Sequence, residues 1–304
     1  MDMTLHILGC GSAKPTTRHM PSSQLLELRG KYYMIDCGEG VQVTMQRLGL
    51  AMLKVGHIFI SHNHGDHVFG LPGLISSMAL LGRTAQLHIH APQDVEPLVN
   101  LTLDMYCRSM EYEVVFHPVC TYEQYVVFQD RSVKVESIPL DHRVDCCGYL
   151  FRETQSLPHI RREMIDAFSI PVSQINNIKM GAGWTTPDGT YLPHERLTTP
   201  AAPAKSYAYC SDTRYMPQNA RIIEGVNLLY HEATFTRDDL DRALKTMHST
   251  SVQAAALASQ AHVGQLLIGH YSARISDENV LLEEAKSVFK NTILAFEGQK
   301  IEVF

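Results

Sequence analysis

Six residues in the first quarter of the chain limit its possible folds more than any other part of the sequence. The run His-Asn-His-Gly-Asp-His at residues 62–67 places three imidazoles and one carboxylate within six positions. It directly follows the apolar stretch Val55 to Ser61, which has the composition of a buried strand. Imidazole and carboxylate groups are ligands for Zn²⁺, Mn²⁺ or Fe²⁺, and two histidines at i and i+2 can point at one ion. The run therefore predicts a metal centre where a strand ends.

Length and composition exclude several classes of protein. The chain has 304 residues, of which 45% are hydrophobic and 19% charged, which is typical of a folded globular protein and not of a disordered or fibrous one. The formal net charge of −6 argues against a protein that coats nucleic acid through general basicity. It leaves room for a local basic groove, because phosphate recognition depends on clustered charges.

The termini and the cysteines bear on location. The N-terminus shows no basic leader followed by an apolar segment, and no apolar run of about 18 residues occurs, so we expect neither secretion nor a membrane span. The seven cysteines form an odd set without a Cys-x-x-Cys pair. This pattern predicts free thiols in a reducing compartment, and hence a cytoplasmic protein.

Strands and helices alternate in both halves of the chain, which predicts an α/β fold with helix-covered sheets. The helical spacing after the His-rich run extends over residues 68–78. Further strands are expected at residues 5–8, 24–28, 31–35, 87–90, 133–139, 148–151, 207–211, 228–230 and 266–269. Further helices are expected at residues 41–48, 94–110, 238–247, 251–261 and 281–290.

Residues 152–205 do not continue this alternation of strands and helices. They contain scattered prolines, and their hydrophobic residues show no clear helical or strand periodicity. An irregular segment of this length within a compact domain is usually functional or disordered. It carries six cationic and five anionic side chains, a net charge of +1, whereas the remainder of the chain carries −7. The insertion is thus less acidic than the body of the protein.

Three more ligand candidates follow predicted strands further along the chain. His142, Asp212 and His270 each come directly after one. Two four-ligand groups result, with Asp212 shared through its two oxygens: His62, His64, His142 and Asp212 for one ion, and Asp66, His67, Asp212 and His270 for the other. Two ions about 3.5–4 Å apart polarise a phosphoryl oxygen and activate water, so the residues predict a two-metal hydrolase.

Other histidines are interpreted as structural. His88 and His90 also form a His-x-His pair on one strand, but no Asp-His follows them. His6 and His57 stand alone in predicted strands, where histidine is an ordinary half-buried residue.

Short motifs spread over nearly the whole chain carry a resemblance to a known family. They are Leu8-Gly9-x-Gly11, Asp36-Cys37-Gly38-Glu39-Gly40, Ser61-His62-x-His64-x-Asp66-His67, Ser211-Asp212-Thr213, His231-Glu232-Ala233-Thr234, His248-Ser249-Thr250 and His270-Tyr271-Ser272-Ala273-Arg274. The chain resembles the metallo-β-lactamase superfamily and, within it, the ribonuclease Z family, whose members trim the 3′ trailer of precursor tRNA. The last three motifs are the specific ones.

The resemblance implies a four-layer αβ/βα sandwich formed by residues 1–304 as a single catalytic domain. It implies that residues 152–205 are a protruding, flexible arm that serves as a tRNA-binding exosite. It also implies two Zn²⁺ per subunit and a homodimer in which the arm of one subunit serves the active site of the other.

Individual roles are implied as well. By resemblance, Asp66 accepts the proton of the attacking water, His248 protonates the leaving 3′ oxygen, and Glu232 orients His248. The hydroxyls of Ser249 and Thr250 have an alternative interpretation as caps of the Ala-rich helix that follows.

Two further residues are assigned by their chemistry. Asp36 is expected to lie behind the ligands and accept a hydrogen bond from a metal-bound imidazole. The Arg274 guanidinium is a candidate contact of the scissile phosphate, although an ordinary surface arginine is the alternative.

The sequence departs from the family pattern in two places. Thr17 and His19 stand where the family loop Pro-x-Lys-x-Arg-Asn has Lys and Asn, while Pro15 and Arg18 are retained. The Gly-Pro pair of the arm is replaced by Ile-Pro-Val at residues 170–172. These changes affect the expected contacts with tRNA and leave the expected hydrolytic centre intact.

The leading hypothesis is a zinc-dependent endoribonuclease that cleaves precursor tRNA and leaves a 3′-hydroxyl on the tRNA and a 5′-phosphate on the trailer. The alternative is a binuclear-metal hydrolase of small molecules, such as a phosphodiesterase. A third hypothesis, an RNA-binding module with a structural metal, fits less well because structural zinc sites are closed and mononuclear.

Overall fold

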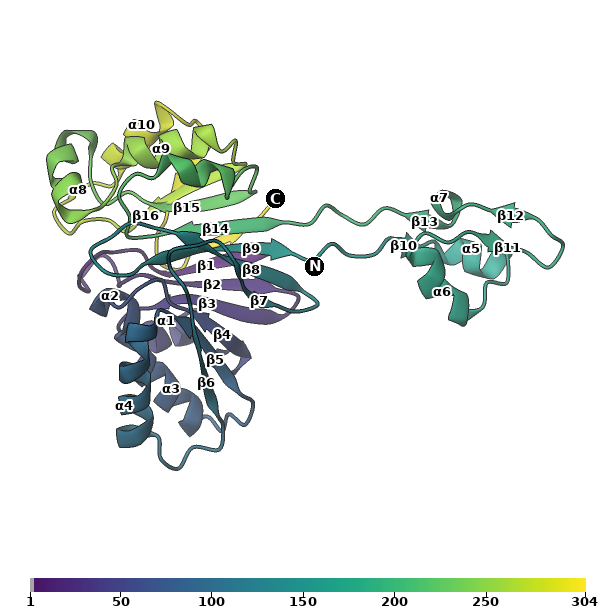
Figure 1. The fold of residues 1–304 in the computed structure, drawn as a ribbon, viewed down its shortest axis with the longest axis horizontal. Coiled ribbons are helices and arrows are strands. Elements are labelled where there is room, and N and C mark those ends of the chain that lie inside the picture. The colour runs from purple at the N-terminus through teal and green to yellow at the C-terminus, as the bar shows by residue number, and fades with distance from the viewer. Residues whose placement is uncertain (1–2) are drawn as a thin grey trace. The chain divides into compact units, whose positions relative to one another are not determined.

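The computed structural model describes residues 3–304 and divides them into two compact units (Figure 1). The first comprises residues 3–152 and 205–304, and the second comprises residues 153–204. In the first unit two seven-stranded sheets pack face to face, with helices on their outer faces.

The N-terminal sheet has the strand order β18-β1-β2-β3-β4-β5-β6. Its first three strands pair antiparallel, and β3 to β6 pair parallel. The strands are β1 (Thr4–Gly9), β2 (Ser23–Leu28), β3 (Lys31–Cys37), β4 (Val55–Phe59), β5 (Leu87–Ala91), β6 (Val114–Pro118) and β18 (Lys300–Glu302). The helices of this half are α1 (Val41–Arg47), α2 (Gly65–Val68), α3 (Gly70–Leu80) and α4 (Glu96–Tyr106), with short 3₁₀ turns η1 (Met52–Lys54) and η2 (Gln93–Val95).

The C-terminal sheet has the order β17-β16-β15-β14-β9-β8-β7. Its strands β14 to β17 are parallel, and β14 pairs antiparallel with β9. The strands are β7 (Val126–Gln129), β8 (Val133–Pro139), β9 (Cys147–Glu153), β14 (Ser206–Cys210), β15 (Leu228–Glu232), β16 (Gln265–Gly269) and β17 (Thr292–Leu294). Its helical elements are α8 (Leu240–Thr246), α9 (Ser251–Gln260), α10 (Asn279–Lys286), η3 (Pro217–Arg221) and η4 (Arg237–Asp239).

Successive side chains of the N-terminal sheet point to opposite faces and contribute to two hydrophobic cores. In β3, Tyr33 and Ile35 point into the cluster shared with the opposite sheet, where Phe151 lies. The intervening Met34 points the other way and packs with Met45 of α1. A period of two thus places apolar side chains on both faces, as expected for a sheet covered on both sides. The layers are those of the predicted αβ/βα sandwich.

The second unit contains more regular structure than its sequence suggested. It consists of α5 (Arg162–Ala167), α6 (Val172–Lys179), α7 (His194–Leu197), and the strand pairs β10 (His159–Ile160) with β13 (Thr198–Thr199) and β11 (Trp184–Thr185) with β12 (Tyr191–Leu192). A small core of Ile170, Ile178, Leu192 and Leu197 holds these elements. They are two to eight residues long, too short to give a recognisable period.

The remaining differences from the sequence expectations are local. The strand before the His-rich run ends at Phe59 and not at Ser61, and the last helix spans Asn279–Lys286 and not 281–290. Of residues 3–304, no helix combines the length and the apolarity needed to cross a membrane. All seven cysteines are free, and six are buried.

Candidate active site

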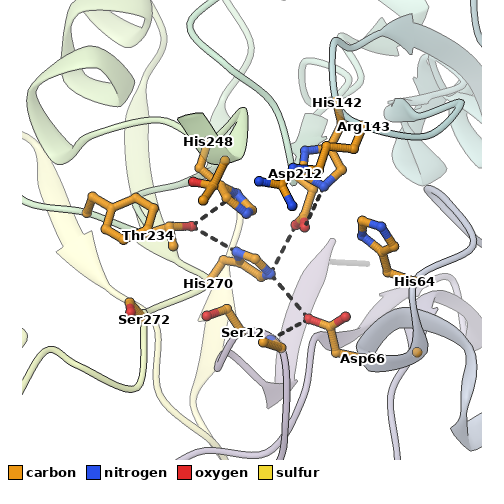
Figure 2. Close-up of a pocket in the computed structure, with 14 residues that line it drawn as sticks. Ser12, His64, Asp66, His142, Arg143, Asp212, Thr234, His248, His270 and Ser272 are labelled. Atoms are coloured by element: carbon orange, nitrogen blue, oxygen red, sulfur yellow. Dashed lines mark hydrogen bonds and ion pairs between the residues drawn. The ribbon is translucent and has the colours of Figure 1, made fainter. Parts of the chain in front are cut away.

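The predicted ligands come from segments that follow strands of both sheets. The His-rich run comes after β4, His142 after β8, Asp212 after β14 and His270 after β16. Asp212 and His270 have positive φ angles of 59° and 61°. Non-glycine residues rarely adopt this backbone conformation, which is often found at functional sites. Figure 2 shows both side chains turned into one pocket.

One group of ligand candidates comprises His62, His64, His142 and Asp212, whose ligand atoms all lie within 4.8 Å of one another. His62 Nε2 is 2.9 Å from His64 Nδ1. Asp212 Oδ2 is 3.6 Å from His62 Nε2 and 3.7 Å from His142 Nε2. These four side chains are the set expected from the sequence for the first ion.

A second group comprises Asp66, His67 and His270, also within 4.8 Å. Asp66 Oδ2 lies 3.6 Å from the Nε2 atoms of both histidines. Asp212 Oδ1 lies 3.3 Å from His67 Nε2 and 3.0 Å from His270 Nε2. The two oxygens of Asp212 therefore face different groups, which is the arrangement of a bridging carboxylate.

The hydrogen bonds of the imidazoles fit metal binding. The Nε2 atoms of His67 and His270 are buried and make no hydrogen bond within the described part of the chain. Their Nδ1 atoms contact Asp36 Oδ2 at 2.7 Å and Thr234 Oγ1 at 2.9 Å. His142 Nδ1 likewise donates to a main-chain carbonyl, that of Met247, at 3.0 Å. Metal-binding histidines are usually held in this way, with one ring nitrogen hydrogen-bonded and the other free for the ion.

The electrostatics also favour cations. Burial opposes the charged form of His67, but the carboxylates around it, that of Asp212 above all, raise its pKa well above the usual value. Burial likewise opposes ionisation of Asp212, yet His270, His67 and His62 hold its pKa well below its usual range. Burial and the neighbouring His67 lower the pKa of His62. Without ions, protons must balance this buried negative charge, and metal cations can replace them.

Asp36 lies behind the ligand candidate His67, on the side of its Nδ1 atom. Its side chain is fully buried and accepts hydrogen bonds from Ser61 N at 2.7 Å, Ser61 Oγ at 2.9 Å and Tyr209 Oη at 2.6 Å, besides its contact with His67. Asp36 thereby fixes the ring of His67 and the start of the His-rich run together.

Glu232 and His248 form a pair at the edge of the pocket. Glu232 ends β15 with a fully buried carboxylate, and its Oε1 lies 2.7 Å from His248 Nδ1. Thr213 N and Thr234 Oγ1 also donate to this carboxylate, at 3.0 and 2.6 Å. Burial opposes the charged imidazole, but Glu232 raises the pKa of His248 to about 9. His248 is thus protonated at neutral pH, which is the state that a general acid requires.

A cavity of about 420 Å³ that opens to solvent is lined by six of these side chains, namely His64, Asp66, His142, Asp212, His248 and His270 (Figure 2). Two contributors were missed from the sequence. Arg143, next to His142, lines the cavity and donates to the Lys245 carbonyl at 3.0 Å. Ala13 N donates to Asp66 Oδ2 at 2.6 Å. Arg143 could have been found from the sequence, because it directly follows the ligand candidate His142. Ala13 could not, because any residue except proline has a backbone N–H.

Arg274 lies outside this cavity. It lines an adjoining one of about 550 Å³, which shares Phe235, Thr246 and Ser272 with the first. The Arg274 side chain is exposed and does not line the first cavity, and its contact with the scissile phosphate stays a prediction.

Of the two hydroxyls after His248, only that of Thr250 caps the helix that follows. Thr250 caps α9 in a capping box with Gln253, and Ser249 Oγ donates to the Thr213 carbonyl at 2.7 Å. Both hydroxyls thus hold the backbone next to His248.

Similarity to known proteins is extensive. A ribonuclease Z of Bacteroides thetaiotaomicron is 52% identical over 98% of this chain and 95% of its own length. A ribonuclease Z of Parabacteroides distasonis is 51% identical over 99% of both chains. The crystal structure of the short form of human tRNase Z matches with a TM-score of 0.73 at 20% identity, over 99% of this chain and all of that one. The family model described as Anti-Pycsar protein Apyc1 matches residues 3–157.

Proposed function

The chain belongs to the ribonuclease Z family, and through residues 3–157 also to that of the anti-Pycsar protein Apyc1, and we propose that it removes the 3′ trailer of precursor tRNA with two zinc ions. It is a phosphodiester hydrolase of tRNA 3′ processing. We propose that the products are a tRNA with a 3′-hydroxyl and a trailer with a 5′-phosphate. The observation that carries the proposal is the position of Asp212. Its Oδ2 faces His62 and His142, and its Oδ1 faces His67 and His270.

Seven side chains would hold the ions. His62, His64, His142 and Asp212 would bind one, and Asp66, His67, Asp212 and His270 the other. When bound, two such ions polarise the phosphoryl oxygen and lower the pKa of water. The mixed imidazole and carboxylate donors suit zinc, and the free Nε2 atoms of two of these histidines support the assignment.

Asp66 is the proposed proton acceptor. Its Oδ2 is held by the Ala13 amide and faces His67 and His270. These two imidazoles lower the pKa of Asp66 in spite of its burial, so the carboxylate is ionised and able to take a proton. The backbone hydrogen bond keeps it oriented toward the pocket.

His248 is the proposed proton donor. Its Nδ1 is engaged by Glu232, so its Nε2 carries the proton that can pass to the leaving 3′ oxygen. Asp66 lines the pocket from α2 and His248 from the segment between α8 and α9, so that base and acid would approach a bound phosphodiester from separate elements.

Recognition of the substrate is proposed to involve residues 153–204. This unit carries its own core and interrupts the β9–β14 pair of the catalytic body, so it can present side chains to RNA without contributing to the sandwich. Folded RNA is recognised through shape and backbone phosphates, which suits such an appendage. Homodimerisation and a cytoplasmic location complete the proposal, by analogy with the family.

The test is an incubation of the purified chain, loaded with zinc, with a precursor tRNA and separately with a chromogenic phosphodiester. Release of the trailer supports the nuclease. Hydrolysis of the small diester without cleavage of any precursor would contradict it and favour the alternative, a phosphodiesterase of small molecules.

A further inference from the structure

A second cluster of ligand-type side chains lies outside the catalytic pocket. Cys10 Sγ, His19 Nδ1 and a carboxylate oxygen of Glu297 all lie within 4.8 Å of one another. The sulfur is 3.4 Å from His19 Nδ1 and 3.5 Å from Glu297 Oε1, and Glu297 Oε2 is 3.1 Å from His19 Nδ1. These residues join the segment after β1 to the segment before β18.

The spacing is that of a tetrahedral zinc site. Zinc binds sulfur at about 2.3 Å and nitrogen or oxygen at about 2.0–2.2 Å, which places tetrahedral ligands roughly 3.3–3.6 Å apart. The three observed distances lie at or close to this range. The Cys10 side chain is fully buried, while those of His19 and Glu297 retain 14% and 22% exposure, so an ion and a water ligand have access.

The surroundings of His19 add an independent observation. Its other ring nitrogen, Nε2, lies 3.2 Å from Glu278 Oε1, and Arg18 Nη1 donates to the same oxygen at 2.8 Å. A carboxylate on the far nitrogen of an imidazole is the usual support of a metal-binding histidine. His19 is also one of the two positions at which this loop departs from the ribonuclease Z pattern.

We propose that Cys10, His19 and Glu297 form a further metal-binding site, for Zn²⁺, separate from the catalytic pair. Binding releases the thiol proton and the proton held between His19 and its carboxylates to solvent, and a water completes the shell. None of the three residues lines the catalytic cavity. In the metal-free state the same atoms form a hydrogen-bonded network, which the ion replaces.

Such an ion would fix a loop that reaches the catalytic pocket. The Tyr271 amide donates to the Cys10 carbonyl at 3.1 Å, directly after the ligand candidate His270. Three residues beyond Cys10, the Ala13 amide holds Asp66. The proposed site would therefore connect the loop that contacts Asp66 and the residue after His270 to the segment that contains Glu297.

Cobalt(II) provides a test that separates this site from the catalytic one, because no catalytic ligand candidate is a cysteine. The full-length protein saturated with Co²⁺ is expected to show near-ultraviolet thiolate-to-cobalt charge-transfer absorption and to bind one more ion than Cys10→Ser does. The absorption should disappear in Cys10→Ser and in His19→Asn. It should persist in Cys146→Ser, the matched control, whose sulfur lies 3.4 Å from the Asp212 carbonyl.

The spectrum of the wild-type protein tests the proposal even if a variant does not fold. Absence of the absorption from wild-type protein at saturating Co²⁺ overturns the proposal. So does its persistence in folded Cys10→Ser, or its loss in Cys146→Ser. Cleavage of precursor tRNA is measured separately, so that failure of this site is distinct from failure of the proposed nuclease function.

Discussion

Glu232 holds His248 through a 2.7 Å contact between its buried carboxylate and the imidazole Nδ1. The contact has two consequences. It fixes which ring nitrogen faces the pocket, and it stabilises the protonated ring, so that the pKa of His248 rises to about 9. A pair of this kind is useful where a leaving oxygen needs a proton at neutral pH.

Replacing His248 by Ala should slow cleavage by roughly 10²–10⁴, the usual effect of losing a general acid. Metal content should stay unchanged, because the two groups of ligand candidates are complete without His248. Single-turnover cleavage and metal analysis on the same samples provide the check. A variant that loses zinc would assign His248 to the metal shell instead.

The pH profile should carry the signature of the same pair. Because the pKa of His248 is raised, the imidazole is protonated below about pH 9 and loses its proton above it, so cleavage should decline on the alkaline side. Glu232→Gln removes the stabilising charge and should move this decline toward the ordinary histidine pKa of about 6.5. Single-turnover rates across pH measure it. If the decline at alkaline pH does not move in Glu232→Gln, the decline does not report the titration of His248.

Asp66→Ala should abolish cleavage and weaken binding of the second ion, since the proposal gives Asp66 both a ligand and a proton-acceptor role. Affinity for precursor tRNA should change little, because the proposed contacts with the RNA backbone are in residues 153–204. Filter binding and metal analysis distinguish the two effects. Asp104→Ala, which removes an exposed carboxylate of α4, is the control and should leave both unchanged. Full metal content in an inactive Asp66→Ala would remove Asp66 from the ligand set.

Asp36→Asn should lower metal affinity by about 10–100-fold, the usual effect of a lost hydrogen bond behind a ligand. The amide of Asn has the shape of the carboxylate, but its NH₂ group donates hydrogen bonds. It would face Ser61 and Tyr209, which also donate, so these hydrogen bonds would be lost. Tyr209→Phe removes only one of these hydrogen bonds, at 2.6 Å, and should have a smaller effect. Competition with a chelator gives both affinities. Equal affinities in wild type and Asp36→Asn would mean that His67 needs no carboxylate to bind.

Deleting residues 155–200 should remove cleavage of precursor tRNA and preserve hydrolysis of a small phosphodiester. Arg152 pairs with Ser206 in the β9–β14 ladder, so a short glycine-rich turn can close the gap as a hairpin. Rates on both substrates are compared in one preparation. Parallel loss of both activities would argue that the second unit supports the catalytic body and not RNA recognition.

The positions of the ligand candidates could be predicted because the same order recurs: an apolar strand, then a histidine or aspartate. Strands β14 and β16 run parallel in one sheet and end at one edge, so Asp212 and His270 are expected to lie close together. The His-rich run follows β4 of the other sheet, so its proximity to them depends on how the two sheets pack. The sharing of Asp212 between the two groups was also predicted, whereas its positive φ of 59° left no signal in the sequence.

Other features left too little signal in the sequence. The edge strands β6 and β7 are half-exposed along most of their length and lack the buried positions that mark a central strand. The short elements of residues 153–204 pack by contacts distant in sequence, such as Ile170 with Leu192 and Leu197. The cluster of Cys10, His19 and Glu297 joins positions nearly 290 residues apart, which no local pattern could connect.

The central claim is that two metal ions held by these seven side chains hydrolyse the trailer of precursor tRNA. Mapping the cleavage site and end groups during zinc titration of the metal-free protein tests it most directly. We expect activity to saturate when two zinc ions per chain are bound beyond the one proposed at Cys10, with a 3′-hydroxyl on the tRNA and a 5′-phosphate on the trailer, because water attacks the phosphorus. An uncut precursor with both catalytic ions bound, or a 2′,3′-cyclic phosphate end produced by attack of the RNA's own hydroxyl, would contradict it.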